Sequence, residues 1–361
     1  MADCLEIYIF FVVLECMQPS LLYYSEDMIA YHSKMSSPLP ITPSDDQFSD
    51  NVLRPLSLNE YIGQSQIKKN LSILLGAAKA RGHSPEHVLF YGPPGLGKTT
   101  LAHVIAREVG ANLRVTSGPA IERVGDLAAI LTNLQPGDML FIDEIHRLNK
   151  TIEEVLYPVM ETGKLDIMIG KGPSARTIQL ELPPFTLLGA TTRFGMLSSP
   201  LRSRFSGGAF RLDFYTDEEI STIIGRSASI LNVALPSELL QSVASRSRKT
   251  PRIANYLLRR VRDYAQMHQK EIDSDSVRDA FELLGLDENG LSQSDLTILT
   301  TLRDKFSGGP TGVKNLAAAT GEDEGTIEDV IEPYLIQLGL IERTPRGRIL
   351  SDKGREYLVN E

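Results

Sequence analysis

Residues 92–99, GPPGLGKT, have the residue types and the spacing of a loop that binds phosphate. Glycines let successive backbone N–H groups curl around phosphate oxygens, and a helix that begins here adds the positive end of its dipole. We expect Gly95 and Gly97 to supply this freedom, Lys98 to reach the β- and γ-phosphates of a nucleotide, and the Thr99 hydroxyl to hold Mg²⁺.

The residues on either side of this loop favour phosphate binding over a chance glycine turn. The apolar run at residues 87–91, HVLFY, predicts a short buried strand, and a helical pattern follows from about residue 99 to residue 109. Strand, glycine-rich loop and helix in this order are the context that a phosphate loop requires.

A second pair of candidate residues, Asp143 and Glu144, follows the apolar run MLFI at residues 139–142. Carboxylates at the C-terminal ends of buried parallel strands lie in the ligand crevice of an open sheet. Asp143 would complete the Mg²⁺ shell, and Glu144 would orient or deprotonate the attacking water. A solvated acidic pair is the alternative, but the position downstream of a phosphate loop favours nucleotide hydrolysis.

Composition sets limits on the class of protein. The chain has 361 residues, a formal net charge of −9 and two cysteines, Cys4 and Cys16. A net negative charge argues against a protein that coats DNA, but leaves room for a local basic patch. Cysteines confined to the N-terminal end cannot support a disulfide framework or a metal site, which suits a reducing, cytoplasmic location.

Residues 1–50 differ from the rest. Residues 7–14, IYIFFVVL, are apolar but too few to span a bilayer as a helix, and the flanks lack the features of a signal peptide. Residues 36–50 are rich in Ser, Pro and Asp, as linkers are. We expect a disordered N-terminal extension and linker, with a membrane or partner anchor as the less favoured alternative.

From residue 51 the pattern predicts an α/β protein. A helix at residues 67–81 and strands at residues 87–91, 139–142 and from 185 onward alternate with helices, as in a parallel sheet covered on both faces. Helices alone follow, at residues 216–231, 237–248, 251–268 and 274–284. Short helices and a β-ribbon at about residues 340–350 end the chain. We therefore expect a large ATPase domain at 51–215, a small helical lid at 216–286 and a winged-helix domain at 287–361.

Several longer motifs resemble the RuvB family, the AAA+ ATPases that move Holliday junctions. The resemblance runs from about residue 53 to about residue 348, and its main motifs are LRPLSLNEYIGQ, GPPGLGKTTLA, TSGPAIE, LFIDEIHRLN, LDIMIGKGPSAR, LPPFTLLGATTR, SSPLRSRF, TPRIANYLLRRVRDYAQ and EPYLIQLGLIERTPRGR. Clamp loaders and replication initiators share the phosphate loop and the Asp-Glu pair, but not GKGPSAR or RTPRGR. The resemblance implies an AAA+ P-loop domain, a helical lid and a C-terminal winged helix.

The resemblance also implies roles for single residues. Arg204 looks like an arginine finger that completes the site of the next subunit, with Arg202 as its rival within SPLRSRF. Thr192 would sense the γ-phosphate, with Thr191 as the alternative. Lys98, Glu144 and Arg204 would form the catalytic group. The residues implied to bind ATP are Leu53, Arg54, Gly95, Gly97, Lys98, Thr99, Thr100, Asp143, Glu161, Thr162, Gly163, Thr192, Arg204, Tyr215 and Arg252.

Two further surfaces follow from the resemblance. Residues 165–182 predict a hairpin with a Gly-Pro tip, which would dock the junction-binding partner RuvA; an ordinary buried hairpin is the alternative. Near the C-terminus Arg343, Arg346, Arg348, Lys353 and Arg355 cluster, and the resemblance makes Arg343 and Arg348 the DNA contacts. A solvated basic face is the alternative there.

The chain departs from the family in the segment RFSGGAFRLDFY, which has one extra residue and two consecutive glycines. We expect this loop to be looser than usual. Between the two arginines of SPLRSRF the chain has Ser203, where the family carries an acidic residue.

The leading hypothesis is a homohexameric ATP-driven DNA motor that works with RuvA and the RuvC resolvase on Holliday junctions in DNA repair. Another AAA+ remodeller such as a clamp-loader subunit is the second hypothesis. A DNA-binding regulator that uses ATP only as a switch is the third, and Glu144 and Arg204 argue against it. None of these three function hypotheses requires a membrane as a partner.

Overall fold

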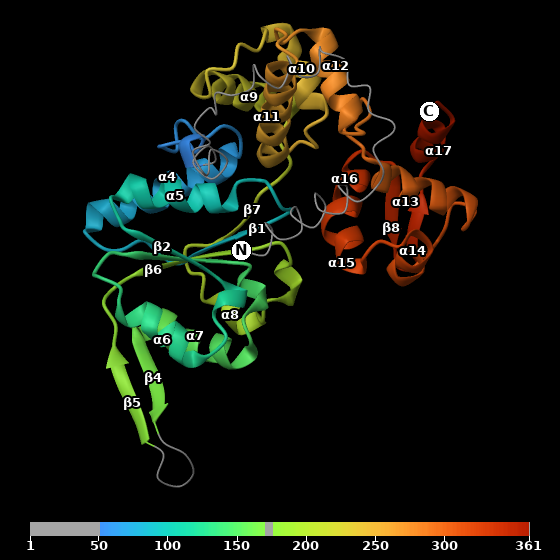
Figure 1. The fold of residues 1–361 in the computed structure, drawn as a ribbon. Helices are drawn as coiled ribbons and strands as arrows, with labels where there is room; N and C mark the ends of the chain where they lie inside the picture. Colours follow the sequence, from blue (N-terminus) through green and yellow to red (C-terminus); the bar gives the residue numbers. More distant parts are fainter. Residues whose placement is uncertain (1–50, 170–175, 361) are drawn as a thin grey trace, which may run out of the picture. The chain divides into compact units, whose positions relative to one another are not determined.

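The computed structural model describes residues 51–169 and 176–360 (Figure 1). The expectations for the N-terminal extension at residues 1–50 and for the hairpin tip therefore lie outside the described residues. Within the described ranges, no helix is both long and apolar enough to cross a membrane.

The centre of the large domain is a five-stranded parallel sheet in the order β2-β3-β6-β1-β7. The three central strands are buried along almost their whole length, as expected of strands covered on both faces. The strands are β1 (Val88–Tyr91), β2 (Leu113–Ser117), β3 (Met139–Asp143), β6 (Thr186–Thr191) and β7 (Ala209–Arg211).

Helices cover both faces of this sheet, as Figure 1 shows. Val88 and Phe90 of β1 belong to one hydrophobic cluster with α4 (Ser65–Arg81) and α5 (Lys98–Val109). Leu89, between them in the sequence, belongs to a second cluster. That cluster includes residues of α6 (Val124–Thr132), α7 (Lys150–Thr162) and α8 (Ser199–Ser203). The alternation of side chains along each strand therefore divides the core into two layers.

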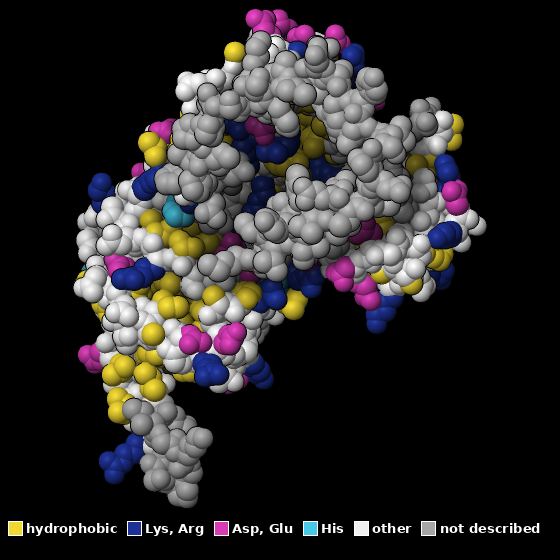
Figure 2. All heavy atoms as spheres, viewed as in Figure 1, with side chains coloured by type: hydrophobic (Ala, Val, Ile, Leu, Met, Phe, Trp, Pro, Cys, Tyr) yellow, Lys and Arg dark blue, Asp and Glu magenta, His cyan; other side chains and the backbone are white. Residues whose placement is uncertain are grey.

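A two-stranded antiparallel hairpin extends from the large domain (Figure 1), with β4 (Lys164–Ile169) paired to β5 (Arg176–Glu181). Leu165 at its base is fully buried, whereas Ile178 further out is 46% exposed. Hydrophobic side chains remain visible on the stem of the hairpin in Figure 2. The hairpin is thus not an ordinary buried one.

The lid consists of α9 (Asp217–Ile230), α10 (Ser237–Ser245), α11 (Pro251–Met267) and α12 (Ser274–Leu283). Its first helix begins with a capping box, in which the Thr216 hydroxyl and the Glu219 carboxylate each accept from the other's backbone N–H. Lid residues such as Ile220 and Leu257 belong to the same hydrophobic cluster as α4 and α5. The lid and the side of the large domain that carries α4 and α5 therefore share one core.

The C-terminal unit is a winged helix with its own hydrophobic cluster. The ribbon of β8 and β9 is antiparallel, and Arg343 pairs with Arg348 in its register. The elements are α13 (Gln293–Asp304), α14 (Val313–Thr320), α15 (Glu324–Thr326), the π-helix η5 (Ile327–Ile331), α16 (Glu332–Gln337), β8 (Ile341–Thr344), β9 (Gly347–Leu350) and α17 (Asp352–Asn360).

The expected fold class is confirmed, but the segment RFSGGAFRLDFY is not loose, and that prediction is wrong. The backbone N–H of Gly207 donates to the His87 carbonyl at 2.9 Å, and the Gly208 carbonyl accepts from Leu89 at 3.0 Å. A Cβ on Gly207 would lie 2.9 Å from the same His87 carbonyl. The two glycines therefore allow close approach to β1, and the chain continues directly into strand β7.

Candidate nucleotide-hydrolysis site

The phosphate loop joins β1 to α5, and its carbonyl groups are hydrogen-bonded on the protein side. The Gly92 and Pro93 carbonyls each accept from the Lys98 ammonium at 2.8 Å. The Gly95 carbonyl accepts from the backbone N–H of Arg252 at 3.4 Å, and the Gly97 carbonyl accepts from Leu101 at 2.8 Å. A backbone whose carbonyls are satisfied inward is free to present N–H groups outward to phosphate.

Lys98 is nearly buried in this loop. Burial lowers the pKa of its ammonium group to about 8, and the carboxylates of Asp143 and Glu144 oppose that shift. Its place on two carbonyls at the mouth of the loop fits the phosphate-binding role expected from the sequence.

Two buried tyrosines support the loop from beneath. The hydroxyl groups of Tyr61 and Tyr215 both donate to the Leu96 carbonyl, at 3.3 and 3.1 Å, and lie 3.0 Å apart. Burial raises the pKa of Tyr215 to about 12, so its hydroxyl remains a donor. A Cβ on Gly97 would lie 2.7 Å from the Tyr61 hydroxyl. Tyr215, expected to contact nucleotide, therefore contacts the loop that would bind it.

Thr99 and Asp143 lie together where a Mg²⁺ ion is expected. The Thr99 hydroxyl is 3.2 Å from Oδ2 of Asp143, and Oδ1 of Asp143 accepts from the Glu144 backbone N–H at 2.9 Å. A hydroxyl and a carboxylate oxygen side by side, next to a phosphate loop, fit an ion that takes few protein ligands and completes its shell with phosphate and water.

Glu144 has a constrained position. Its backbone is in the left-handed region, with φ of 49°, which is uncommon for a residue other than glycine. A Cβ on Gly118, just after β2, would lie 2.4 Å from the Glu144 carbonyl oxygen. The backbone of Glu144 is therefore fixed from the neighbouring strand, which supports a role in orienting a reactant.

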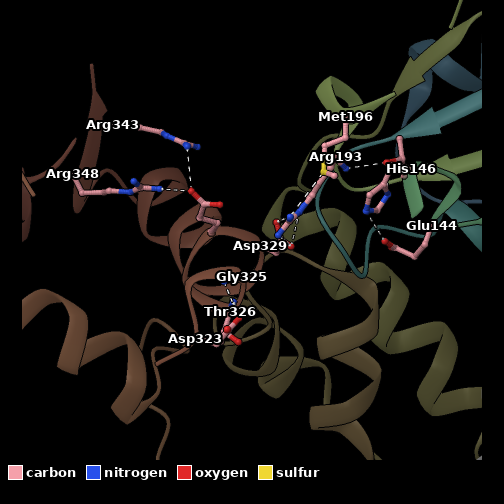
Figure 3. Close-up of polar contacts among 12 residues, drawn as sticks. Glu144, His146, Arg193, Met196, Asp323, Gly325, Thr326, Asp329, Arg343 and Arg348 are labelled. Atoms are coloured by element: carbon pink, nitrogen blue, oxygen red, sulfur yellow. Dashed lines mark hydrogen bonds and ion pairs between the residues drawn. The ribbon is translucent and has the colours of Figure 1, made fainter. Parts of the chain in front are cut away.

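The Glu144 carboxylate faces His146, whose Nε2 lies 3.4 Å from Oε2 (Figure 3). Nδ1 of His146 is 2.9 Å from the hydroxyl of Thr191, the last residue of β6. Burial lowers the pKa of His146, which favours the neutral imidazole. The structure thus assigns Thr191 a buried place in this network, whereas Thr192 is partly exposed.

The lid contributes Arg252 at the start of α11. A Cβ on Gly95 would lie 3.3 Å from Cβ of Arg252, so the loop and the helix approach closely at a glycine. Arg252 is exposed and opposes protonation of Lys98 electrostatically. Both features suit a cation that faces bound phosphate.

The residues expected at the base end of the nucleotide lie at the large domain's junction with the lid. The Leu53 carbonyl accepts from Arg226 of α9 at 3.2 Å. The His103 side chain on α5 has a pKa lowered to about 4, first by burial and then by the charge of Arg54. Thr100 lies beside Thr99 in the first turn of α5.

Arg204 lies apart from the phosphate loop. Its guanidinium pairs with Glu161 at 2.9 Å, donates to the Pro200 carbonyl at 2.7 Å and lies 4.5 Å above the ring of Tyr157. These contacts belong to α7 and α8, which pack on the face of the sheet opposite α5. Glu161, Thr162 and Gly163 are at the C-terminal end of α7. The predicted site residues therefore form two groups in one chain, one around the loop and one around Arg204.

Family models match almost all of the described chain. One described as the Holliday junction DNA helicase RuvB P-loop domain matches residues 53–211. The RuvB AAA lid domain matches residues 215–287, and the RuvB C-terminal winged helix domain matches residues 288–359. The chain belongs to the RuvB family. It is thus an AAA+ ATPase.

Individual RuvB proteins are similar over most of their length. The Holliday junction branch migration complex subunit RuvB of Dehalococcoides mccartyi is 58% identical over 306 residues, which cover 84% of this chain and 87% of that protein. The Thermotoga maritima RuvB Holliday junction branch migration motor is 49% identical, with a TM-score of 0.78, and the match covers 86% of this chain and 99% of that chain. A mutant of the same Thermotoga protein has a TM-score of 0.79 at the same identity and coverage.

The two arginines expected to contact DNA differ in their surroundings. Arg348 is buried and pairs with Glu332 at 2.8 Å and with Glu328 at 3.0 Å. Arg343 is exposed, and its pairs with the same two carboxylates are longer, at 3.5 and 3.7 Å. In this RuvB-family winged helix, Arg343 is therefore the better placed to meet a phosphate, and Arg348 holds the ribbon against η5 and α16.

Four residues of the site were not predicted from the sequence: Tyr61, Gly118, His146 and Arg193, whose backbone N–H donates to the Thr191 hydroxyl oxygen at 3.0 Å. All four lie within motifs shared with the RuvB family, such as TSGPAIE and DEIHRLN. Nothing in their residue types marks them as site residues, because their roles depend on contacts with distant parts of the chain.

Replacing Lys98 by Ala should lower kcat for ATP hydrolysis by roughly a hundred-fold or more, because one preorganised charge at the transferring phosphoryl group is lost. The matched control is Lys150→Ala, which removes a lysine that is 86% exposed on α7. Steady-state ATPase assays would check both variants. Full turnover by the Lys98 variant would show that this loop is not the catalytic site.

Proposed function

We propose that this chain is the ATP-driven motor of Holliday junction branch migration in recombination and DNA repair. One observation carries the proposal: the chain combines a complete phosphate loop and Asp143-Glu144 pair with a winged helix in one continuous RuvB-type architecture. Hydrolysis and DNA contact are then functions of the same chain, which is what a translocating motor needs. Work on DNA would place the protein in the cytoplasm.

The residues of the site have separable roles in ATP hydrolysis. Backbone N–H groups of the loop and Lys98 bind the phosphates, and Arg252 of the lid contacts the γ-phosphate side. Mg²⁺ held by Thr99 and Asp143 would neutralise charge on the phosphate oxygens. Glu144 orients and deprotonates the attacking water, while Thr192 reports the presence of the γ-phosphate.

The position of Arg204 supports a homo-oligomer, and we propose a hexamer. The contacts described for Arg204 are with α7 and α8, which pack on the face of the sheet opposite α5, rather than with its own phosphate loop. As a finger supplied in trans, it would stabilise charge on the phosphoryl group bound by the next subunit. Glu161, Thr162 and Gly163, which accompany it, would then line the same shared interface.

Two surfaces of the chain, the β4–β5 hairpin and the winged helix, suggest which partners it binds. The hairpin of β4 and β5 presents a partly exposed apolar stem, including Ile178, which suits docking of RuvA. RuvC would join the complex to resolve the junction. The winged helix would contact duplex DNA through Arg343, mainly at phosphates, so binding would not depend on sequence.

The central test is migration of a synthetic four-way junction with ATP and Mg²⁺, with and without RuvA. We expect RuvA-stimulated migration by the parent chain and none by Glu144→Gln, which should still bind ATP. DNA-stimulated hydrolysis without migration would instead favour another AAA+ remodeller. A clamp-loader subunit would then be recognised by stable association with a sliding clamp.

A second test should distinguish the role of Arg343 in DNA binding from the role of Arg348 in stability. Arg343→Ala should weaken duplex binding equally for all sequences and reduce the slope of log affinity against log salt by about 1. Arg348→Ala should mainly lower the melting temperature, because buried Glu332 loses its partner. Salt titrations and thermal melts of both variants would check this. A steeper loss of salt dependence for Arg348→Ala, with an unchanged melt, would reverse the assignment.

A further inference from the structure

A chain of contacts joins Glu144 to the winged helix (Figure 3). The backbone N–H of Arg193 donates to the Thr191 hydroxyl oxygen at 3.0 Å, and that hydroxyl lies 2.9 Å from Nδ1 of His146. A neutral imidazole that accepts the Thr191 proton at Nδ1 carries its own proton on Nε2, the ring nitrogen nearest to Glu144. Two hydrogen bonds and one close contact thus link the backbone of Arg193 to the Glu144 carboxylate, so we expect a shift of Arg193 to change the position of that carboxylate.

The Arg193 side chain leaves the ATPase site and meets Asp329 of η5. Its Nε lies 2.9 Å from Oδ2 and 3.0 Å from Oδ1 of Asp329, and its terminal nitrogen also donates to Oδ2. Both side chains are 35% exposed. Partly exposed ion pairs contribute little to stability, so this contact can open and close.

The same turn of η5 also holds the DNA-contacting ribbon. Glu328, next to Asp329, pairs with Arg343 at 3.5 Å and with Arg348 at 3.0 Å. A phosphate that binds Arg343 competes with Glu328 for its guanidinium. One π-helical segment therefore connects the ribbon on one side with the large domain on the other, and π-helical turns often mark functional sites.

A second ion pair connects the winged helix to the lid and, unlike the first, is buried. Arg248 pairs with Asp295, which is fully buried, and its Nε donates to the Gly290 carbonyl at 3.0 Å. Arg248 lies four residues before Arg252. The buried pair is suited to a permanent link, so the winged helix would follow the lid while its contact with Arg193 is broken and made.

We propose that Arg193 is a positioning residue of the ATPase site and that Asp329 holds it in a resting arrangement while the winged helix is docked. In this arrangement the Glu144 carboxylate lies against His146, at 3.4 Å from Nε2, and is less available to activate water. DNA that engages Arg343 loosens η5, releases Arg193 and frees Glu144. The proposal rests on the proposed function, since it assumes that Glu144 activates water and that Arg343 meets DNA.

The test compares Asp329→Asn with Glu324→Gln in the full-length chain. Glu324 is an exposed acid in α15 that is not among the carboxylates that raise the pKa of Arg193, so its substitution removes the same charge without removing an ion pair of Arg193. Asp329→Asn should raise DNA-free kcat by roughly five-fold or more, within the usual range of coupling between sites, and leave KM for ATP unchanged. The fold-stimulation by a four-way junction should fall by the same factor, and Glu324→Gln should match the parent.

A charge swap distinguishes positioning from simple damage. Arg193→Asp combined with Asp329→Arg should restore the low basal rate and the junction response, whereas each single change should not. Asp329→Asn that behaves like Glu324→Gln would overturn the proposal. A loss of kcat or a raised KM, unrepaired by the swap, would also overturn it.

These outcomes are separable from the proposed function. If the parent chain migrates junctions but Asp329→Asn has the parental basal rate, the motor function stands and the positioning role fails. If the parent neither migrates junctions nor responds to them, the motor function fails. A raised DNA-free rate in Asp329→Asn would still support the link between Asp329 and the ATPase site.

Discussion

The phosphate loop can bind nucleotide only if its N–H groups face outward, and this requires partners for its carbonyl groups inside the protein. Those partners come from distant parts of the chain. Tyr61 precedes the sheet, Tyr215 follows it, and Arg252 begins a lid helix, yet each donates to a loop carbonyl. The loop is therefore one of the places where the large domain and the lid meet, so a bound nucleotide would lie against both.

The same arrangement explains why the lid and the winged helix matter to the chemistry. Arg252 and Arg248 lie in one short segment, with Arg252 against the loop and Arg248 bound to Asp295 of the winged helix. Arg193 follows the strand that carries Thr191 and reaches Asp329 of the same winged helix. The winged helix is thus connected to both segments that we propose to face the γ-phosphate. The Arg248–Asp295 pair is buried, which suits a permanent link. The Arg193–Asp329 pair is partly exposed, which suits a contact that opens and closes.

The fold class and the centre of the nucleotide site could be predicted from the sequence, because the phosphate loop and the Asp143-Glu144 pair have fixed local spacing. Strand β2 was not predicted because it is an edge strand with exposed residues such as Val115, and β7 was not because it has only three residues. Sequence also could not distinguish Arg343 from Arg348. Both are arginines on one ribbon, and only the neighbouring Glu328 and Glu332 decide which is buried. Contacts between residues far apart in the sequence, such as Arg193 and Asp329, produce no periodicity or characteristic spacing in the sequence.

In the proposed motor, the ATPase site of one chain is incomplete, and a second copy completes it with Arg204. Mixing Arg204→Ala with Glu144→Gln subunits tests this most directly, since each variant lacks a different half of the interface. Both should be inactive alone, yet roughly a quarter of the interfaces in an equal mixture should pair an intact Glu144 with an intact Arg204. The account predicts recovered ATP hydrolysis that peaks near equal ratios. No recovery at any ratio, although the two variants co-assemble, would contradict it.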